Sequence, residues 1–143
     1  MTLTNTMRIL AGAFLLFSTA SASPQGIAFA YAPERGSGVC TGENAGETLE
    51  CARNNCVEQS GASPDDCAQM TWCANAGWSV GVGIMHKEGI HWSEFSCGWP
   101  TQESALAAGA ILCDAEHREF IAECTVGMLW NKVGQEFPMD SDE

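Results

Sequence analysis

Basic residues are scarce in this sequence. The chain has six lysines and arginines against 18 aspartates and glutamates, which gives a formal net charge of −12. Proteins that bind nucleic acids or anionic membranes need a basic surface, and six such residues among 143 do not supply one. The composition therefore argues against nucleic acid as a partner and favours a basic protein.

Long apolar runs are also missing. The run at residues 9–17 has nine residues, whereas a membrane-spanning helix needs about 20. It follows Arg8 and precedes the small-residue triplet 20–22, an order typical of a secretory signal peptide. We therefore predict a signal peptide at residues 1–22, with Met7 as an alternative start, and export to the bacterial periplasm or medium. Its cleavage removes Arg8, leaves a charge of −13 and leaves no membrane-inserted segment.

Motifs that mark catalytic or cofactor sites are absent as well. The serines lack a Gly-x-Ser-x-Gly elbow, and the sequence has no glycine-rich phosphate loop, haem-attachment motif or calcium loop. Carboxylates are abundant, yet none of them stands out as an acid–base pair. The sequence thus predicts a non-enzymatic protein without cofactor or metal, and the alternative is a hydrolase with an unrecognised carboxylate site. The carboxylates considered are Glu94, Glu103, Asp114, Glu116, Glu119 and Glu123.

Cysteine, in contrast, is plentiful. All eight cysteines follow the predicted signal peptide, and cysteines in an exported chain normally form disulfides. The spacings from Cys51 to Cys56 and from Cys67 to Cys73 are looser than zinc ligands usually have. An even number leaves no thiol for catalysis, so we predict four disulfide bonds.

The cysteines also indicate an internal repeat. Cys40, Cys56 and Cys67 recur 57 residues later as Cys97, Cys113 and Cys124. We interpret this shift as two similar halves, about 27–73 and 78–130, within one domain of residues 23–137. Residues 138–143 are predicted to be a solvated acidic tail.

Both halves have the same predicted order of strand, strand, helix and strand. Apolar periodicity places strands at 27–31, 39–40 and 68–73 and a helix at 45–58 in the first half. In the second half it places strands at 78–84, 92–99 and 125–130, and a helix that starts at 100–101 and contains Leu112. The predicted fold is α+β and disulfide-rich, with helices packed on an antiparallel sheet.

The repeat constrains the disulfide pairing. A symmetric scheme makes one bond inside each half, Cys56–Cys67 and Cys113–Cys124. The remaining bonds are then Cys40–Cys97 between the halves and Cys51–Cys73, because Cys51 and Cys73 have no repeat counterparts. The pairing of Cys40 with Cys97 is left open.

Three stretches carry a resemblance to a known family. They are residues 49–56 followed by Cys67, residues 70–80, and residues 101–113 followed by Cys124. Over residues 27–130 the chain resembles the bacterial family called domain of unknown function 4189. The resemblance implies a small exported protein and brings no assigned activity with it.

Polar and aromatic residues gather around one predicted turn. His86, Glu88 and His91 surround Gly89, and alternation along the next strand places Trp92 and Glu94 on one face and Phe95, Cys97 and Trp99 on the other. An exposed tryptophan is a common anchor in recognition, and loop tips often carry binding residues. The alternatives are a solvated turn and a transition-metal site. A solvated turn is the leading interpretation of this loop, and the candidate partner-binding residues are His86, Glu88, His91, Trp92 and Glu94.

Rigidity and charge together favour a binding role. A cross-linked scaffold loses little conformational entropy on binding, and a negative surface speeds encounter with a basic protein. The leading hypothesis is an exported binding protein, such as an inhibitor or immunity protein of a cationic partner. The alternative is a structural, envelope-associated protein.

Overall fold

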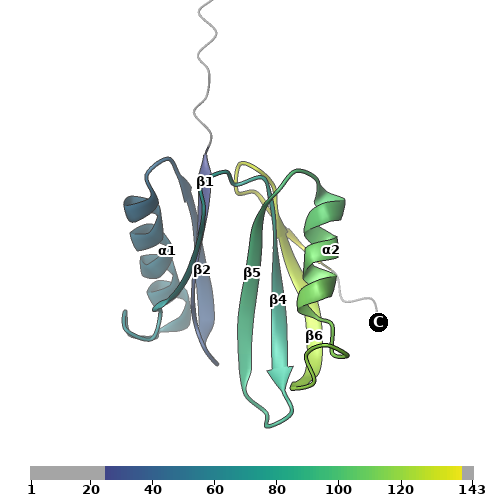
Figure 1. The fold of residues 1–143 in the computed structure, drawn as a ribbon. Helices are drawn as coiled ribbons and strands as arrows, with labels where there is room; N and C mark the ends of the chain where they lie inside the picture. The colour runs from purple at the N-terminus through teal and green to yellow at the C-terminus, as the bar shows by residue number, and fades with distance from the viewer. Residues whose placement is uncertain (1–24, 140–143) are drawn as a thin grey trace, which may run out of the picture.

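Two antiparallel sheets lie face to face, and one helix covers the outer face of each. The computed structural model describes residues 25–139, so the predicted signal peptide and residues 140–143 lie outside the described part. Helix α1 (Ala45–Ser60) and helix α2 (Gln102–Leu112) form the outer layers (Figure 1). The predicted α+β class is confirmed. No helix among the described residues is long and apolar enough to cross a membrane.

The strands form two sheets instead of one, and both sheets have the same internal order. The first sheet contains β1 (Gly26–Ala32), β2 (Gly36–Gly42) and β3 (Gln69–Cys73), ordered β2-β1-β3. The second contains β4 (Trp78–His86), β5 (His91–Trp99), β6 (Ile121–Trp130) and β7 (Glu136–Pro138), ordered β5-β4-β6-β7. Strand β7 is not predicted from the sequence, and Pro138 pairs with Met128 instead of belonging to the acidic tail.

Local signals explain where the helices begin and end. The Asn44 side chain accepts a hydrogen bond from the Glu47 amide and caps α1, which ends at Gly61 in the left-handed conformation. Thr101 and Ser104 form a capping box at the start of α2. These caps satisfy terminal N–H and C=O groups that the helices leave unpaired.

The pleat of β1 divides its side chains between two cores. Small side chains, Ala28 and Ala30, face α1, whereas Ile27 and Phe29 face the second sheet. Helix α1 lies so close to β2 that a Cβ atom on Gly38 would come within 2.2 Å of the Cys56 amide nitrogen. Small residues on this face therefore set the helix–sheet distance.

Aromatic rings join the two sheets. The Phe29 ring stacks on Phe95 with ring centroids 4.6 Å apart, and it meets Trp130 edge-on at 4.9 Å. Ile27 and Ala76, both fully buried, complete this core. Because Phe29, Phe95 and Trp130 come from β1, β5 and β6, the aromatic core fixes one sheet against the other.

The structure corrects half of the predicted disulfide scheme. Cys56–Cys67 and Cys113–Cys124 are confirmed, and the other bonds are Cys40–Cys51 and Cys73–Cys97. The predicted pairs Cys40–Cys97 and Cys51–Cys73 are wrong.

Strand pleating gives the reason. Cys40 lies opposite Ala28 on the face that α1 covers, so it meets Cys51 of the helix. Cys73 lies opposite Ile27 on the inter-sheet face, so it reaches Cys97. The bond between the halves is therefore made by Cys73.

The predicted position of Trp99 is wrong because β5 contains a bulge. The register between β4 and β5 shifts after the Trp78–Trp99 pair, and Gly98 adopts a φ of 84°. Phe95 and Cys97 share one buried face, as predicted, and this face meets the first sheet, but Trp99 packs with Ala105 and Ala108 of α2. The extra residue in the strand moves Trp99 to the opposite face.

Candidate functional site: a cleft between the sheets

The space between the two sheets is filled only near the aromatic core. Beyond it lie two adjoining hollows, about 500 Å³ and about 350 Å³ in volume, which share Gly83 and Ser93. We call them together the inter-sheet cleft. Side chains normally fill the roughly 10 Å between packed sheets, and unfilled space costs stability. A cleft of this kind therefore requires an explanation other than packing.

Three rows of side chains cross the cleft face of the second sheet. Strand pairing aligns His91, Met85 and Glu123 in the outer row and Ser93, Gly83 and Thr125 in the middle row. The innermost row contains Phe95, Gly81 and Met128 and borders the aromatic core. The rows thus change from charged, through small and polar, to apolar as the cleft deepens.

Glycines create the open space in this wall. A Cβ atom on Gly81 would lie 3.1 Å from Trp130 and 3.2 Å from Phe95, so this glycine makes room for the aromatic rings. A Cβ atom on Gly83 or Gly127 would meet nothing within 4 Å. Gly81 therefore serves the core, whereas Gly83 and Gly127 leave bare backbone facing the cleft.

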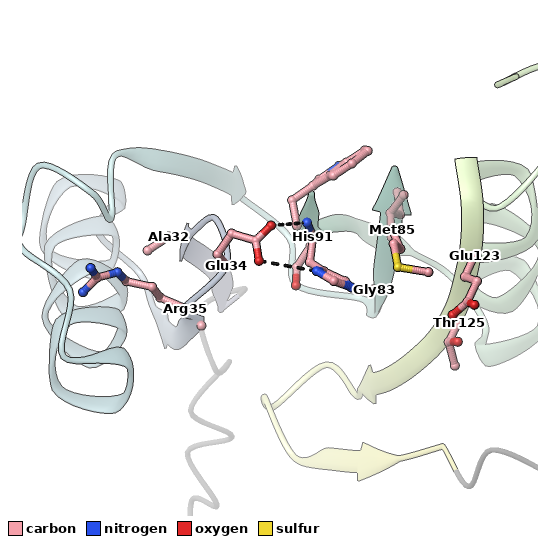
Figure 2. A pocket seen from close by; sticks show the side chains of 12 residues that line it. Ala32, Glu34, Arg35, Gly83, Met85, His91, Glu123 and Thr125 are labelled. Atoms are coloured by element: carbon pink, nitrogen blue, oxygen red, sulfur yellow. Dashed lines mark hydrogen bonds and ion pairs between the residues drawn. The ribbon is translucent and has the colours of Figure 1, made fainter. Parts of the chain in front are cut away.

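One contact crosses the mouth of the cleft. The backbone amide of His91 and its Nδ1 atom both bind the carboxylate of Glu34, and the Glu34 amide donates to the His91 carbonyl (Figure 2). The backbone hydrogen bond from His91 is the main cause that holds the pKa of Glu34 below its usual value. Glu34 therefore stays ionised, and it ties the β1–β2 turn to the start of β5.

The cleft is lined by more negative than positive charge. Glu34, Glu123 and Glu136 line it, and Arg35 is the basic residue of the lining. Figure 2 shows the Arg35 side chain pointing away from Glu34 and His91. Its charge also helps to lower the pKa of Asp66, after the hydrogen bonds from Ser63 that dominate that shift. The cleft therefore offers a cation an acidic environment.

On the wall that the second sheet forms, three side chains leave all their hydrogen-bonding groups free. Within residues 25–139, the side chains of Ser93, Glu123 and Thr125 make no hydrogen bond or ion pair with other residues. They come from the outer and middle rows of the same wall. Their oxygens are available to a ligand that donates hydrogen bonds.

The structure separates the predicted partner-binding residues into two groups. His91 lines the mouth of the cleft, whereas the side chain of Trp92 lies with Glu94 on the opposite face of β5. His86 and Glu88 lie at the β4–β5 turn, where the Glu88 amide donates to Nδ1 of His86. The Trp92 side chain, predicted to be exposed, is partly buried against Val82, Ile84 and Ile121.

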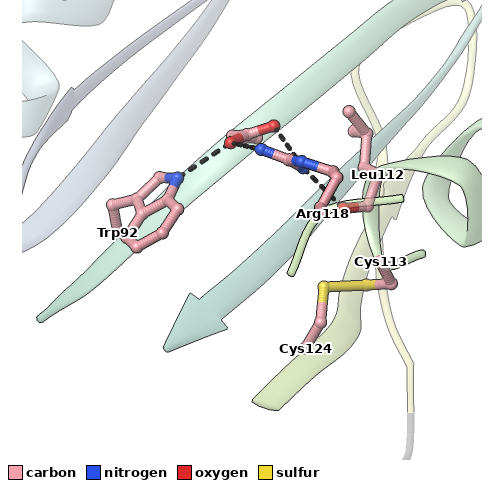
Figure 3. Close-up of polar contacts among 6 residues, drawn as sticks. Trp92, Leu112, Cys113, Arg118 and Cys124 are labelled. Atoms are coloured by element: carbon pink, nitrogen blue, oxygen red, sulfur yellow. Dashed lines mark hydrogen bonds and ion pairs between the residues drawn. A yellow bond between two sulfur atoms is a disulfide. The ribbon is translucent and has the colours of Figure 1, made fainter. Parts of the chain in front are cut away.

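Glu94 belongs to a structural ion pair on the side of the sheet away from the cleft. Arg118 donates two hydrogen bonds to the Glu94 carboxylate, at 2.6 and 3.1 Å, and Trp92 donates a third at 2.9 Å (Figure 3). Arg118 also binds the Leu112 carbonyl and lies over the Phe120 ring. Burial alone would raise the pKa of Glu94, but the hydrogen bonds from Arg118 and Trp92 and the Arg118 charge lower it. This network joins β5 to the loop before β6.

Sequence reasoning missed most of the cleft. Glu34, Gly83, Glu123 and Gly127 are not among the predicted site residues. One signal was available, because Gly81 and Gly83 alternate within a strand and must leave one face of it without side chains. Placing Glu34 beside His91, 57 residues away, required the tertiary structure.

The cleft offers hydrogen-bond acceptors and negative charge to a ligand. No group of three or more histidine, cysteine, aspartate or glutamate side chains within residues 25–139 is placed to hold a metal ion. The carboxylates and hydroxyls of the cleft accept hydrogen bonds and attract positive charge. All eight cysteines are in disulfides.

Comparison of the chain with protein-family models, curated proteins and solved structures found no match.

Proposed function

We propose that this chain is an exported, non-enzymatic binding protein for a basic protein partner, which it holds at the inter-sheet cleft. The observation that carries the proposal is a cleft left open by glycine and lined by three glutamates. A partner that fills the cleft would bury this surface and supply the missing positive charge. Binding of a partner would then explain why the space between the sheets is left unfilled.

The scaffold suits such a role. Four disulfides hold strands and helices together, and Cys73–Cys97 joins the two halves next to the aromatic core. A binding site that is already ordered loses less entropy when a partner docks. Disulfides form in oxidising compartments, which agrees with export through the predicted signal peptide to the periplasm or the medium.

An inhibitor or immunity protein of a cationic enzyme is the specific form of this proposal. Such a protein binds one partner tightly and needs no catalytic residue. The long-range field of a net-negative chain accelerates association with a basic enzyme, and salt screens this effect. The resemblance to the domain of unknown function 4189 family is part of this proposal and adds no activity to it.

The test is capture of the partner followed by measurement with purified components. The mature chain is immobilised, an envelope extract is passed over it, and the retained protein is identified, purified and titrated. We expect a basic protein whose dissociation constant rises at least tenfold between 50 and 300 mM salt. A dissociation constant that does not change with salt, or a partner without basic character, contradicts the proposal.

Charge variants locate the site. Glu34→Gln with Glu123→Gln should weaken partner binding, because both carboxylates lie in the cleft. Glu47→Gln with Glu119→Gln removes the same charge from exposed positions outside the cleft and is the matched control. Equal effects of the two double variants would contradict binding at the cleft and favour a structural envelope protein.

A further inference from the structure

We propose that the inter-sheet cleft receives one arginine side chain from a loop of the partner. This inference rests on the proposed function and names the group that enters the cleft. The aliphatic part of the arginine passes through the mouth beside Met85, and its guanidinium lies over the bare backbone at Gly83 and binds Glu123.

The two glycines provide a surface that a long, thin side chain fits. Gly83 and Gly127 belong to neighbouring strands, β4 and β6, and a Cβ atom at either position would meet no atom within 4 Å. Met128 and Trp130 line the inner end of the same hollow. A planar guanidinium can lie flat on this bare backbone, while the methylene groups that carry it extend outward through the mouth to the partner.

The acceptors near the mouth match the donors of a guanidinium. Arginine presents five N–H donors in a planar arrangement and binds carboxylates with two parallel hydrogen bonds. Glu123 offers two oxygens, and Ser93 and Thr125 offer one hydroxyl each in the neighbouring row. None of these three side chains bonds another group within residues 25–139. Glu34, ionised at the same mouth, adds negative charge nearby.

Size points to a side chain carried by a loop. The hollow that contains Glu123 measures about 500 Å³ and opens beside His91 and Arg35. A volume of this order lies within the range of small-ligand pockets, roughly 300–1,000 Å³, so it accommodates one long side chain with part of its backbone. A lysine ammonium is a single point charge and lacks the two parallel N–H donors that would bind both carboxylate oxygens of Glu123.

The first experiment uses a small probe on the oxidised, mature chain. Acetyl-Gly-Arg-Gly-amide is titrated while backbone amide shifts are followed by NMR, with the lysine peptide and the neutral citrulline peptide as matched probes. We expect saturable shifts at Gly83, Gly127 and Glu123, and binding roughly tenfold weaker for citrulline because the charge-assisted pair is lost. Shifts scattered over the acidic surface, or equal binding of citrulline, would overturn the inference.

The second experiment fills the cleft. Gly83→Val and Gly127→Val each add a side chain where the structure has open space, and should abolish the localised shifts and weaken partner binding at least tenfold. Ala110→Val, on the exposed face of α2, is the control for added bulk. Unfolding midpoints close to that of the parent chain show that the variants fold.

The outcomes distinguish this inference from the proposed function. If the filled variants keep the affinity of a basic, salt-sensitive partner, the arginine inference fails and the proposed function stands with another contact surface. If no basic partner binds at any salt concentration, the proposed function fails. If the arginine peptide still binds at Gly83 in that case, the cleft binds a cationic group that does not come from a basic protein partner.

Discussion

At the residue scale, two glycines on the same face of β4 have opposite roles. Gly81→Val should lower the free energy of unfolding by about 1–3 kcal/mol, because the new side chain would clash with Trp130 and Phe95. Gly83→Val should leave stability unchanged or raise it by a few tenths of a kcal/mol, roughly the gain from removing a strand glycine. Urea unfolding of both variants measures these changes. An equal loss of unfolding free energy in the two variants would contradict the open space at Gly83.

The Glu94–Arg118 pair predicts a pH dependence of stability. The pKa of Glu94 is lowered in the folded chain, so its contribution is present above the unfolded value, about 4.3, and disappears as pH falls through the folded pKa. Glu94→Gln should cost about 1–2 kcal/mol at pH 7, a value reduced for partial solvent exposure, and progressively less as the pH falls below about 4.

Urea unfolding at several pH values measures this difference. Glu50→Gln is the control, because its contact with Arg53 is long, 3.8 Å, and exposed. It should change stability by less than about 0.5 kcal/mol at every pH. A cost for Glu94→Gln that stays constant from pH 7 to pH 3 would show that the carboxylate charge does not contribute.

At the element scale, pleating and the β5 bulge decide which residues meet. Strand β2 turns Cys40 toward α1, whereas β3 turns Cys73 toward the second sheet. The bulge at Gly98 leaves Cys97 facing Cys73 but moves Trp99 to the α2 side. Equivalent positions in the two halves, such as Cys40 and Cys97, therefore have different partners.

Removal of the bond between the halves should have a measurable cost. Cys73→Ala with Cys97→Ala opens a loop with a sequence separation of 24, which costs about 3.5 kcal/mol by the loop-entropy estimate. Thermal unfolding, compared with Cys113→Ala and Cys124→Ala at a separation of 11, checks the magnitude. Peptide mapping without reduction should link Cys73 to Cys97, and a fragment that joins Cys40 to Cys97 would contradict the structure.

At the scale of the whole molecule, the inter-sheet cleft exists because the inter-sheet core is incomplete. Aromatic side chains and the Cys73–Cys97 bond join the sheets at one side, while glycines leave the other side open. The net charge of −12 then acts over the whole surface, and Glu34 and Glu123 focus it at the mouth. We therefore expect salt to weaken partner binding, because binding depends on the charge of the whole molecule.

Several elements of this fold were predictable from local pattern. Alternation at residues 27–31 predicts β1, and helical spacing of Leu49, Ala52 and Cys56 predicts α1. The 57-residue shift predicts two halves with the same element order. Strand β7 was missed because three residues, with an exposed Phe137, carry no periodic signal.

The candidate site was predictable only in part. The turn that contains His91 was identified, since polar residues cluster there, but Glu94 and Trp92 are used by the Arg118 network on the other face. The glutamates and glycines of the cleft were missed. They come from the β1–β2 turn, β4 and β6, and nothing local relates these segments to one another.

The sequence by itself determined the charge of this protein and the features that follow from local pattern and spacing. These are the predicted signal peptide, the strand–strand–helix–strand halves and the two disulfides that the repeat relates. Such features depend on residues close in the chain or on their spacing. The tertiary structure alone decided the two remaining disulfides, the separation into two sheets and the cleft between them. These depend on the strand face that each residue occupies and on the space between the sheets. A one-residue bulge changes the face, and a glycine in place of a larger residue leaves space open.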